Sequence, residues 1–401
     1  MKLKPPIGLN RHPRSRLTTL VAVGAATLGF ASFAVAQAIP ASADPSQVYV
    51  TVGSDTTQDV MNQYALDLGG NEIGSYNAIN PVSGTAHEVI TPANTAGGNC
   101  SFTRPNGSGE GLAALRKSIN QSTTATQLAA PPQANCIDFS RSSSGPGTNA
   151  SVTGALIYIP FALDAVAGST GPTSGTGATA ITTADSFTSA DLVNLYKNCT
   201  AVTEGGVTYN PGTPATGQIK IDLYVPQAGS GTRNFWATTL GFSSTTLPPC
   251  VHDTIQAGPD ATQPVEEHDG TAVSTDPNGF GPFSIAQWIS QRNGHNDRRH
   301  GAVLHNLNAI SPFVGTAATG TLNTAFPITR EVFNVVPFAK VSGSTADANL
   351  VGLLVGVNSS ICQDSFTITG YGFALLGSTT PDQCGALNNN LRAFDPATNP
   401  V

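Results

Sequence analysis

Apolar residues alternate with polar ones in short stretches that follow each other in the order strand, turn, helix. Residues 48–52, VYVTV, place a valine at every second position, a pattern typical of a β-strand. Gly53 ends this stretch, and apolar residues then recur at roughly helical spacing between Val60 and Leu66. The pattern predicts a strand, a hydroxyl-rich turn over residues 54–57 and a helix.

The same order recurs further along the chain. CIDFSRSSSGPG (136–147) is a short apolar stretch that ends in an arginine and three serines, and GALIYIPFALDAVA (154–167) has the nearly continuous apolar run of a buried strand. FTSADLVNLYKNC (187–199) is typical of a helix capped at its start by a threonine or serine, and IKIDLYVP (219–226) alternates like a strand. Strands that alternate with helices predict an α/β fold with a largely parallel sheet.

The first 43 residues have the composition of a secretory signal peptide. Five basic residues precede an apolar run over residues 17–35, and ASA at 41–43 offers a small-residue cleavage site. A transmembrane anchor is the alternative, but the run is short and Pro40 follows it. No cysteine lies near the cleavage site, so we expect a secreted protein, extracellular or periplasmic, without a lipid anchor.

Removing this segment makes the chain more acidic. The segment holds five of the 18 basic residues and none of the 25 acidic ones, so the remainder has 13 basic and 25 acidic residues and a net charge of −12. Such a chain is repelled by phosphate backbones, so we expect no nucleic acid partner. A small anion would have to be bound by a local field.

Six cysteines are spread over the chain, at positions 100, 136, 199, 250, 362 and 384. An even number in an exported protein predicts disulfides, although the sequence alone cannot choose among the possible pairings. Our hypothesis is that nearest neighbours pair: 100 with 136, 199 with 250 and 362 with 384. No CxxC occurs, which argues against a metal site.

The stretch QAGSGTRNFW (227–236) follows a predicted strand and admits three interpretations. It can be a tight turn, with glycines that bend the chain and a serine that caps a helix. It can present a nucleophile, but a hydrolase elbow needs glycine two positions either side of the serine, and Ala228 and Thr232 flank Ser230 there. It can also bind an anion, because free N–H groups at a helix start, hydroxyls and Arg233 all favour negative charge.

Two other turns, at residues 54–57 and 141–144, share this chemistry. Parallel strands would bring all three turns to one edge of the sheet. The predicted anion cradle combines residues that follow three strands: Ser54, Asp55, Thr56, Arg141, Ser142, Ser143, Ser230, Gly231, Thr232 and Arg233. Arg141 or Arg233 would supply the main cation. We expect no catalytic residue, metal or cofactor.

Five segments in this order resemble the phosphate-binding proteins of ABC importers. They are GSDTTQ, IDFSRSSS, GSGTRNFW, HDGTAVSTDPNGFGPFSIAQW and FPITREVFNVV, within residues 48–380. The resemblance implies a bilobed type II periplasmic-binding-protein fold, with lobe one formed by residues 46–160 and 284–401 and lobe two by residues 161–283. It also implies a monomer that captures inorganic phosphate or a similar tetrahedral oxyanion between its lobes, for uptake by an ABC permease.

This sequence departs from the family's pattern at two positions. Pro226 stands where the family usually has an arginine, and Ser143 where it commonly has an aspartate. Two other functions therefore stay open: a secreted hydrolase of phosphate esters, and a surface or adhesive protein on the same fold that has lost its ligand.

Two polar segments are further candidates. HNDRRHGAVLH (295–305) carries three histidines, but their five-residue spacing fits neither one helix face nor one strand face, so we expect a polar surface hairpin. In PVEEHDG (264–270), Glu266, Glu267 and Asp269 could form an acid–base pair, but we expect them to be solvated charges.

Overall fold

A computed structural model gives the fold and describes residues 49–68, 72–77, 89–90, 102–119, 136–175, 177–377 and 383–395. The predicted signal peptide (1–43) and Cys100 lie outside the described residues. No helix in the described part of the chain combines the length and apolar character that a membrane span needs.

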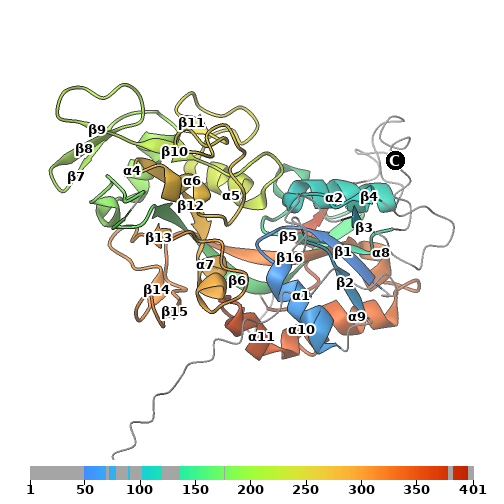
Figure 1. The fold of residues 1–401 in the computed structure, drawn as a ribbon. Helices are drawn as coiled ribbons and strands as arrows, with labels where there is room; N and C mark the ends of the chain where they lie inside the picture. Colours follow the sequence, from blue (N-terminus) through green and yellow to red (C-terminus); the bar gives the residue numbers. More distant parts are fainter. Residues whose placement is uncertain are drawn as a thin grey trace, which may run out of the picture. The chain divides into compact units, whose positions relative to one another are not determined.

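A mixed sheet with helices packed against it forms the centre of the described structure (Figure 1). Its strands run in the order β11-β10-β12-β6-β16-β5-β1-β2, and β13 and β17 pair with β6. The strands of this sheet are β1 (Tyr49–Gly53), β2 (Ile73–Ser75), β5 (Phe139–Ser142), β6 (Leu156–Thr170), β10 (Asp222–Tyr224), β11 (Val251–His252), β12 (Gly279–Ser284), β13 (Val303–Leu304), β16 (Thr329–Pro337) and β17 (Arg392–Ala393).

The predicted α/β fold is confirmed, but the expectation of a largely parallel sheet is wrong. Strand β1 runs parallel to β2 and β5, and β10 runs parallel to β11 and β12. Between these two groups, β6 and β16 make antiparallel pairs with every strand beside them. Local patterning reveals that β6 is buried, but not that its neighbour β16 comes from a segment far along the chain.

Short strands and helices complete the structure. Three small sheets pair β3 (Val89–Ile90) with β4 (Phe102–Thr103), β14 (Phe313–Val314) with β15 (Thr321–Leu322), and β7 (Val202–Glu204) with β8 (Val207–Asn210) and β9 (Ile219–Lys220). The helices are α1 (Gln58–Asp67), α2 (Gly107–Ser118), α4 (Ser189–Tyr196), α5 (Gly231–Leu240), α6 (Thr271–Thr275), α7 (Ile285–Arg292), α8 (Phe338–Val341), α9 (Ala348–Leu354), α10 (Ser360–Gln363) and α11 (Ser365–Gly370), with 3₁₀ turns at Gly147–Asn149, Ala184–Ser186 and Asn389–Leu391.

The starts of α4 and α5 follow the capping residues of the sequence. Thr188 caps α4 and forms a reciprocal capping box with Asp191, as the hydroxyl at this position predicts. Ser230 caps α5, where its Oγ accepts a hydrogen bond from the Arg233 N–H at 3.1 Å. The predicted strand over 219–226 is divided, because β9 and β10 belong to different sheets.

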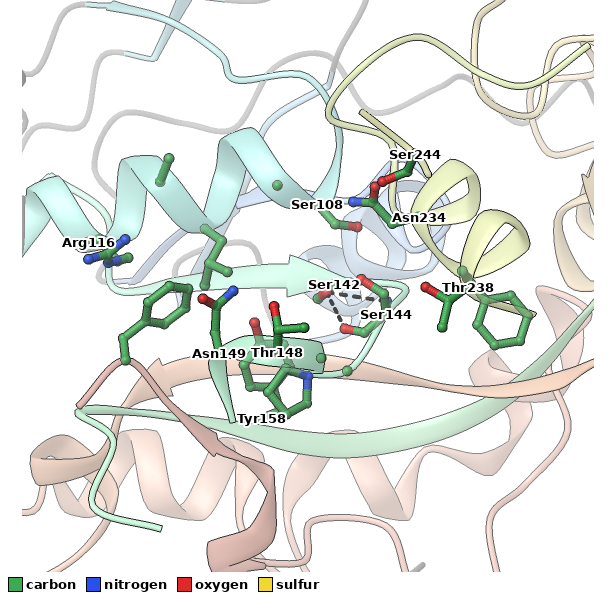
Figure 2. Close-up of a pocket in the computed structure, with 18 residues that line it drawn as sticks. Ser108, Arg116, Ser142, Ser144, Thr148, Asn149, Tyr158, Asn234, Thr238 and Ser244 are labelled. Carbon is green, nitrogen blue, oxygen red and sulfur yellow. Dashed lines mark hydrogen bonds between the residues drawn. The ribbon is translucent and has the colours of Figure 1, made fainter. Parts of the chain in front are cut away.

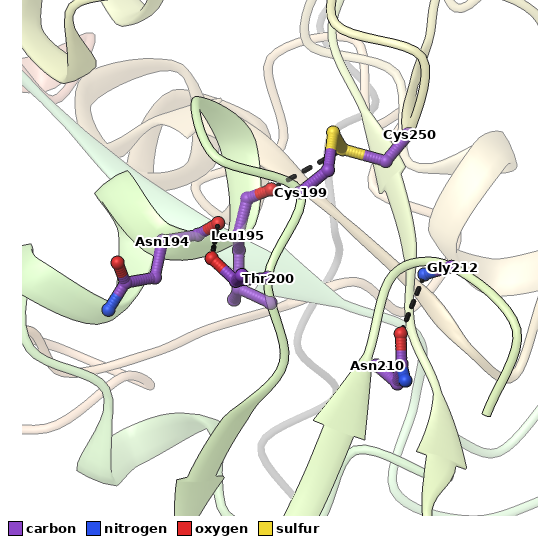
Figure 3. The surroundings of a disulfide bond; sticks show 7 residues. All are labelled: Asn194, Leu195, Cys199, Thr200, Asn210, Gly212 and Cys250. Atoms are coloured by element: carbon purple, nitrogen blue, oxygen red, sulfur yellow. Dashed lines mark hydrogen bonds between the residues drawn. A yellow bond between two sulfur atoms is a disulfide. The ribbon is translucent and has the colours of Figure 1, made fainter. Parts of the chain in front are cut away.

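Two of the predicted disulfides are confirmed. Cys199 pairs with Cys250 beside the end of α4 (Figure 3), and Cys362 pairs with Cys384. Cys136 is also disulfide-bonded. By the chain-entropy estimate, each of the two described bridges contributes about 3–4 kcal/mol to the free energy of unfolding.

Candidate functional site

A buried carboxylate, that of Glu267, lies where two of the three predicted turns meet. Its Oε1 accepts a hydrogen bond from the Thr56 hydroxyl at 3.1 Å and from the Thr232 backbone N–H at 3.2 Å. His268 Nε2 lies 3.2 Å from the same oxygen and 2.7 Å from Thr56 Oγ1. We call Thr56, Thr232, Glu267 and His268 the Glu267 cluster.

Each donor of the Glu267 cluster is positioned by its own element. Thr56 follows β1, in the turn before α1, and Thr232 lies in the first turn of α5, where backbone N–H groups have no partner inside the helix. Glu267 and His268 precede α6, and His268 has a φ of 58°. A non-glycine residue in this left-handed region is strained, so the surrounding contacts must hold the His268 backbone there.

The hydrogen bonds of His268 favour one tautomer. The Ser284 N–H faces His268 Nδ1 at 3.4 Å, so in the neutral form of the ring Nδ1 accepts this hydrogen bond and Nε2 carries the proton. The Nε2–H then donates toward Thr56 Oγ1 or Glu267 Oε1. Every polar group around Glu267 Oε1 can therefore donate to it.

The electrostatic surroundings keep Glu267 ionised. Burial opposes its ionisation, yet several contacts outweigh it and lower the pKa of this carboxyl to about 2. In order of size, these are the hydrogen bond from His268, the charge of this ring when it is protonated, the hydrogen bond from Thr232 and the positive charge of Arg330. Arg330 makes a buried ion pair with Asp164 at 2.8 Å, and its Nη2 also donates to Thr56 Oγ1 at 3.3 Å.

Two polar atoms beside the cluster have unused hydrogen-bonding capacity. Glu267 Oε2 and Arg330 Nη1 are buried and find no partner among the residues that the structure describes. Buried polar atoms in native proteins are seldom left without a partner. Oε2 can accept a further hydrogen bond and Nη1 can donate one, so the two atoms need partners of opposite kind.

The expectation that Glu267 is a solvated charge is therefore wrong. The residue is only 3% exposed, because the segment before α6 folds inward between the turn after β1 and the start of α5. Glu266, its neighbour, is half-buried and bonds to Asn106 and Gln227. The sequence held only a weak signal, because Glu267 stands immediately before the fourth segment of the family resemblance, which begins at His268.

A second group of hydroxyls forms beside the Glu267 cluster. Ser108 Oγ lies 3.3 Å from Ser143 Oγ and accepts a hydrogen bond from the Ser143 N–H at 3.1 Å. A Cβ atom at Gly231 would come within 2.3 Å of both serine oxygens, so only glycine permits this approach. Three chain segments therefore meet here, at Ser108, Ser143 and Gly231.

The two candidate arginines point their guanidinium groups at other partners. Arg141 donates to the Ser54 and Tyr76 carbonyl oxygens and to Ser75 Oγ. Arg233 pairs with Asp253 at 2.8 Å and donates to two backbone carbonyl oxygens. Their role as anion ligands stays a prediction, and a ligand would have to compete with these contacts.

The remaining predicted residues have structural contacts of their own. Asp55 makes an ion pair with buried Arg104 at 2.8 Å, Ser142 Oγ donates to the Ser144 carbonyl at 2.7 Å, and Ser230 Oγ caps α5. A hydroxyl engaged as a helix cap and without a neighbouring base gives no support to a nucleophilic role for Ser230.

The three histidines of residues 295–305 do not share a partner. His295 stacks on Tyr371 with ring centroids 4.0 Å apart, His300 lies 3.6 Å from Asp269, and His305 lies 2.7 Å from Thr170 Oγ1. His305 is buried, so the expectation of a surface hairpin is wrong for this residue. No group of three or more potential metal ligands gathers within the described ranges of the chain.

No protein-family model and no curated protein matches this chain. Among solved structures, it resembles a putative phosphate ABC transporter substrate-binding protein with bound phosphate from Clostridium perfringens, at 11% identity and a TM-score of 0.43, over 81% of this chain and 98% of the other. It also resembles an ABC-type phosphate transport receptor from Vibrio cholerae, at 14% identity and a TM-score of 0.43 with the same coverage. A phosphate-binding protein from Stenotrophomonas maltophilia matches at 16% identity and a TM-score of 0.38, over 88% of this chain and 98% of the other. Identities and scores this low assign no ligand to this chain.

Proposed function

We propose that this protein is an exported receptor for a small oxyanion, with inorganic phosphate as the first candidate. One observation carries the proposal: the Thr56 hydroxyl and the Thr232 N–H at the start of α5 converge on a single carboxylate oxygen, Glu267 Oε1. Donors arranged in this way, at a helix N-terminus, suit a phosphate oxygen as well as a carboxylate oxygen.

An external oxyanion must compete with Glu267 for the cluster. The carboxylate uses the donors that a phosphate oxygen would need, and a second negative charge beside it would be repelled. Ligand binding therefore goes together with displacement of the Glu267 side chain. The ligand would be captured between the two predicted lobes and passed to an ABC permease as uptake partner.

The same observation favours a second candidate function. A cluster whose donors are already satisfied by its own carboxylate needs no ligand, which fits a surface protein that has lost ligand binding. The two candidates differ in a single measurable property, the affinity for free oxyanions.

Isothermal titration of the purified protein with phosphate, sulfate, molybdate and arsenate separates the candidates. We expect Glu267→Gln to bind phosphate at least about tenfold more tightly than the parent, since a charge-assisted hydrogen bond contributes ~1.5–3 kcal/mol and the competing charge is gone. Glu266→Gln removes the same charge one residue away and is the matched control, with affinity near that of the parent. If neither the parent nor Glu267→Gln binds any of the four anions, the receptor function is wrong and the surface-protein candidate remains.

A further inference from the structure

A cavity of about 780 Å³ lies between α2, α5 and the loop after β5 (Figure 2). Its volume falls within the range of small-molecule sites, ~300–1,000 Å³. Ser108, Leu112 and Arg116 line it at four-residue intervals, so one face of α2 forms its wall. From Ser108 to Arg116 the helix rises by about 12 Å, so the cavity is far longer than an inorganic oxyanion.

Arg116 gives this cavity a positive charge at one end. It is the only charged residue among the described residues of the cavity wall. Its guanidinium lies 4.1 Å from the ring centroid of Phe394, and its buried Nε and Nη2 have no acceptor among the residues that the structure describes. Burial lowers the pKa of Arg116, so an acidic ligand group that reached this guanidinium would relieve an electrostatic cost.

The remaining walls combine neutral polar side chains with aromatic rings. Asn149 and Thr148 lie between Arg116 and the far end, where Ser108 and Asn234 project (Figure 2). Amide and hydroxyl side chains can both donate hydrogen bonds to ligand hydroxyls and accept them. The rings of Tyr158, Phe235 and Phe394 supply apolar surface that suits the C–H face of a sugar ring.

We propose that this cavity binds an acidic sugar, a hexose that carries a phosphate or a carboxylate group, with the acidic group at Arg116 and the hydroxyls along Asn149, Thr148 and Asn234. The positive charge of Arg116 favours an anion, and the length of the cavity favours an organic molecule. The mixture of amides, hydroxyls and aromatic rings in its wall favours a hydroxylated ring. This site goes beyond the capture of an inorganic oxyanion at the Glu267 cluster, because none of the four residues of that cluster lines the cavity.

Titration calorimetry of the purified protein with glucose 6-phosphate, glucuronate and neutral glucose tests the proposal. We expect glucose to bind at least about tenfold more weakly than one of the acidic sugars, the size of effect that a charge-assisted hydrogen bond gives. The acidic sugar that binds more tightly shows whether the cavity prefers a phosphate group or a carboxylate group. Arg116→Met should abolish the preference for acidic sugars, whereas Arg116→Lys should keep most of it.

Lys117→Met is the matched control, because it removes the same charge one residue further along α2, outside the cavity wall. Thermal melting of each variant verifies folding.

Equal affinity for glucose and both acidic sugars, or an unchanged preference in Arg116→Met, would overturn the proposal. If inorganic phosphate binds and no sugar does, this inference fails alone and the receptor function stands. If an acidic sugar binds with the expected dependence on Arg116 and inorganic phosphate does not bind, the sugar site is supported and the receptor function for inorganic oxyanions is not.

Discussion

Glu267 determines the chemistry of the candidate site at the scale of single residues. Its carboxylate holds together the turn after β1 and the start of α5, which are far apart in the sequence. Removing a buried charge that has several donors costs stability, because those donors then lack their partner. The residue therefore stabilises the fold and at the same time opposes binding of an external anion.

The pH dependence of the unfolding free energy should report the ionisation of the Glu267 carboxylate. Because its pKa in the folded state, about 2, lies below the ordinary 4.5, the ionised Glu267 stabilises the fold above pH 4.5 and this contribution is lost as the pH falls toward 2. The difference in unfolding free energy between the parent and Glu267→Gln should be largest near neutral pH and should shrink over that range. Urea denaturation at several pH values measures it, and a difference that does not vary with pH would refute this role.

At the scale of elements, the start of α5 depends on one hydroxyl. Ser230 Oγ accepts from the Arg233 N–H, so Ser230→Ala leaves a buried donor without its partner. We expect a loss of about 1 kcal/mol in unfolding free energy, up to ~2 because the site is buried. Thr239→Ala, at an exposed position of the same helix, is the control and should cost nothing, since alanine is the better helix former. Chemical denaturation gives both values, and equal stability of Ser230→Ala and the parent would refute the capping role.

The sequence predicts those elements whose cause is local. The alternation at residues 48–52 predicts β1, the hydroxyl at Thr188 predicts the start of α4, and the apolar run at residues 154–167 predicts β6. Pairing between β6 and β16 depends on contacts between distant segments, so the mixed orientation of the sheet could not be read from patterning.

The same distinction applies to the candidate site. Thr56 and Thr232 were predicted as donors, and the structure brings them to one oxygen atom. The burial of Glu267 and the structural contacts of Arg141 depend on which segments pack together, and neither follows from residue type or spacing.

At the scale of the whole molecule, disulfides tie distant segments together. Cys199 and Cys250 are separated by 51 positions, and Cys362 and Cys384 by 22. The longer closed loop restricts the unfolded chain more, so replacing the first pair by serines should cost about 4 kcal/mol and replacing the second about 3 kcal/mol. Guanidinium denaturation of the two double variants compares the costs, and no loss in either variant would contradict the estimate.

The lobe boundaries remain a prediction at this scale. The proposed boundary after residue 160 falls inside β6, which pairs with β16 at one end and with β12 at the other. If the lobes close on a ligand, β6 is one of the segments that must bend or twist.

We propose that the Glu267 cluster is an oxyanion site that the chain's own carboxylate fills. A crystal structure of Glu267→Gln grown with phosphate would show whether the anion takes the place of the carboxylate. We predict a phosphate oxygen within hydrogen-bonding distance of both the Thr232 N–H and the Thr56 hydroxyl, at roughly 2.7–3.2 Å. A structure with the glutamine amide still bound to these two donors, and with phosphate elsewhere or nowhere in the protein, would contradict the claim.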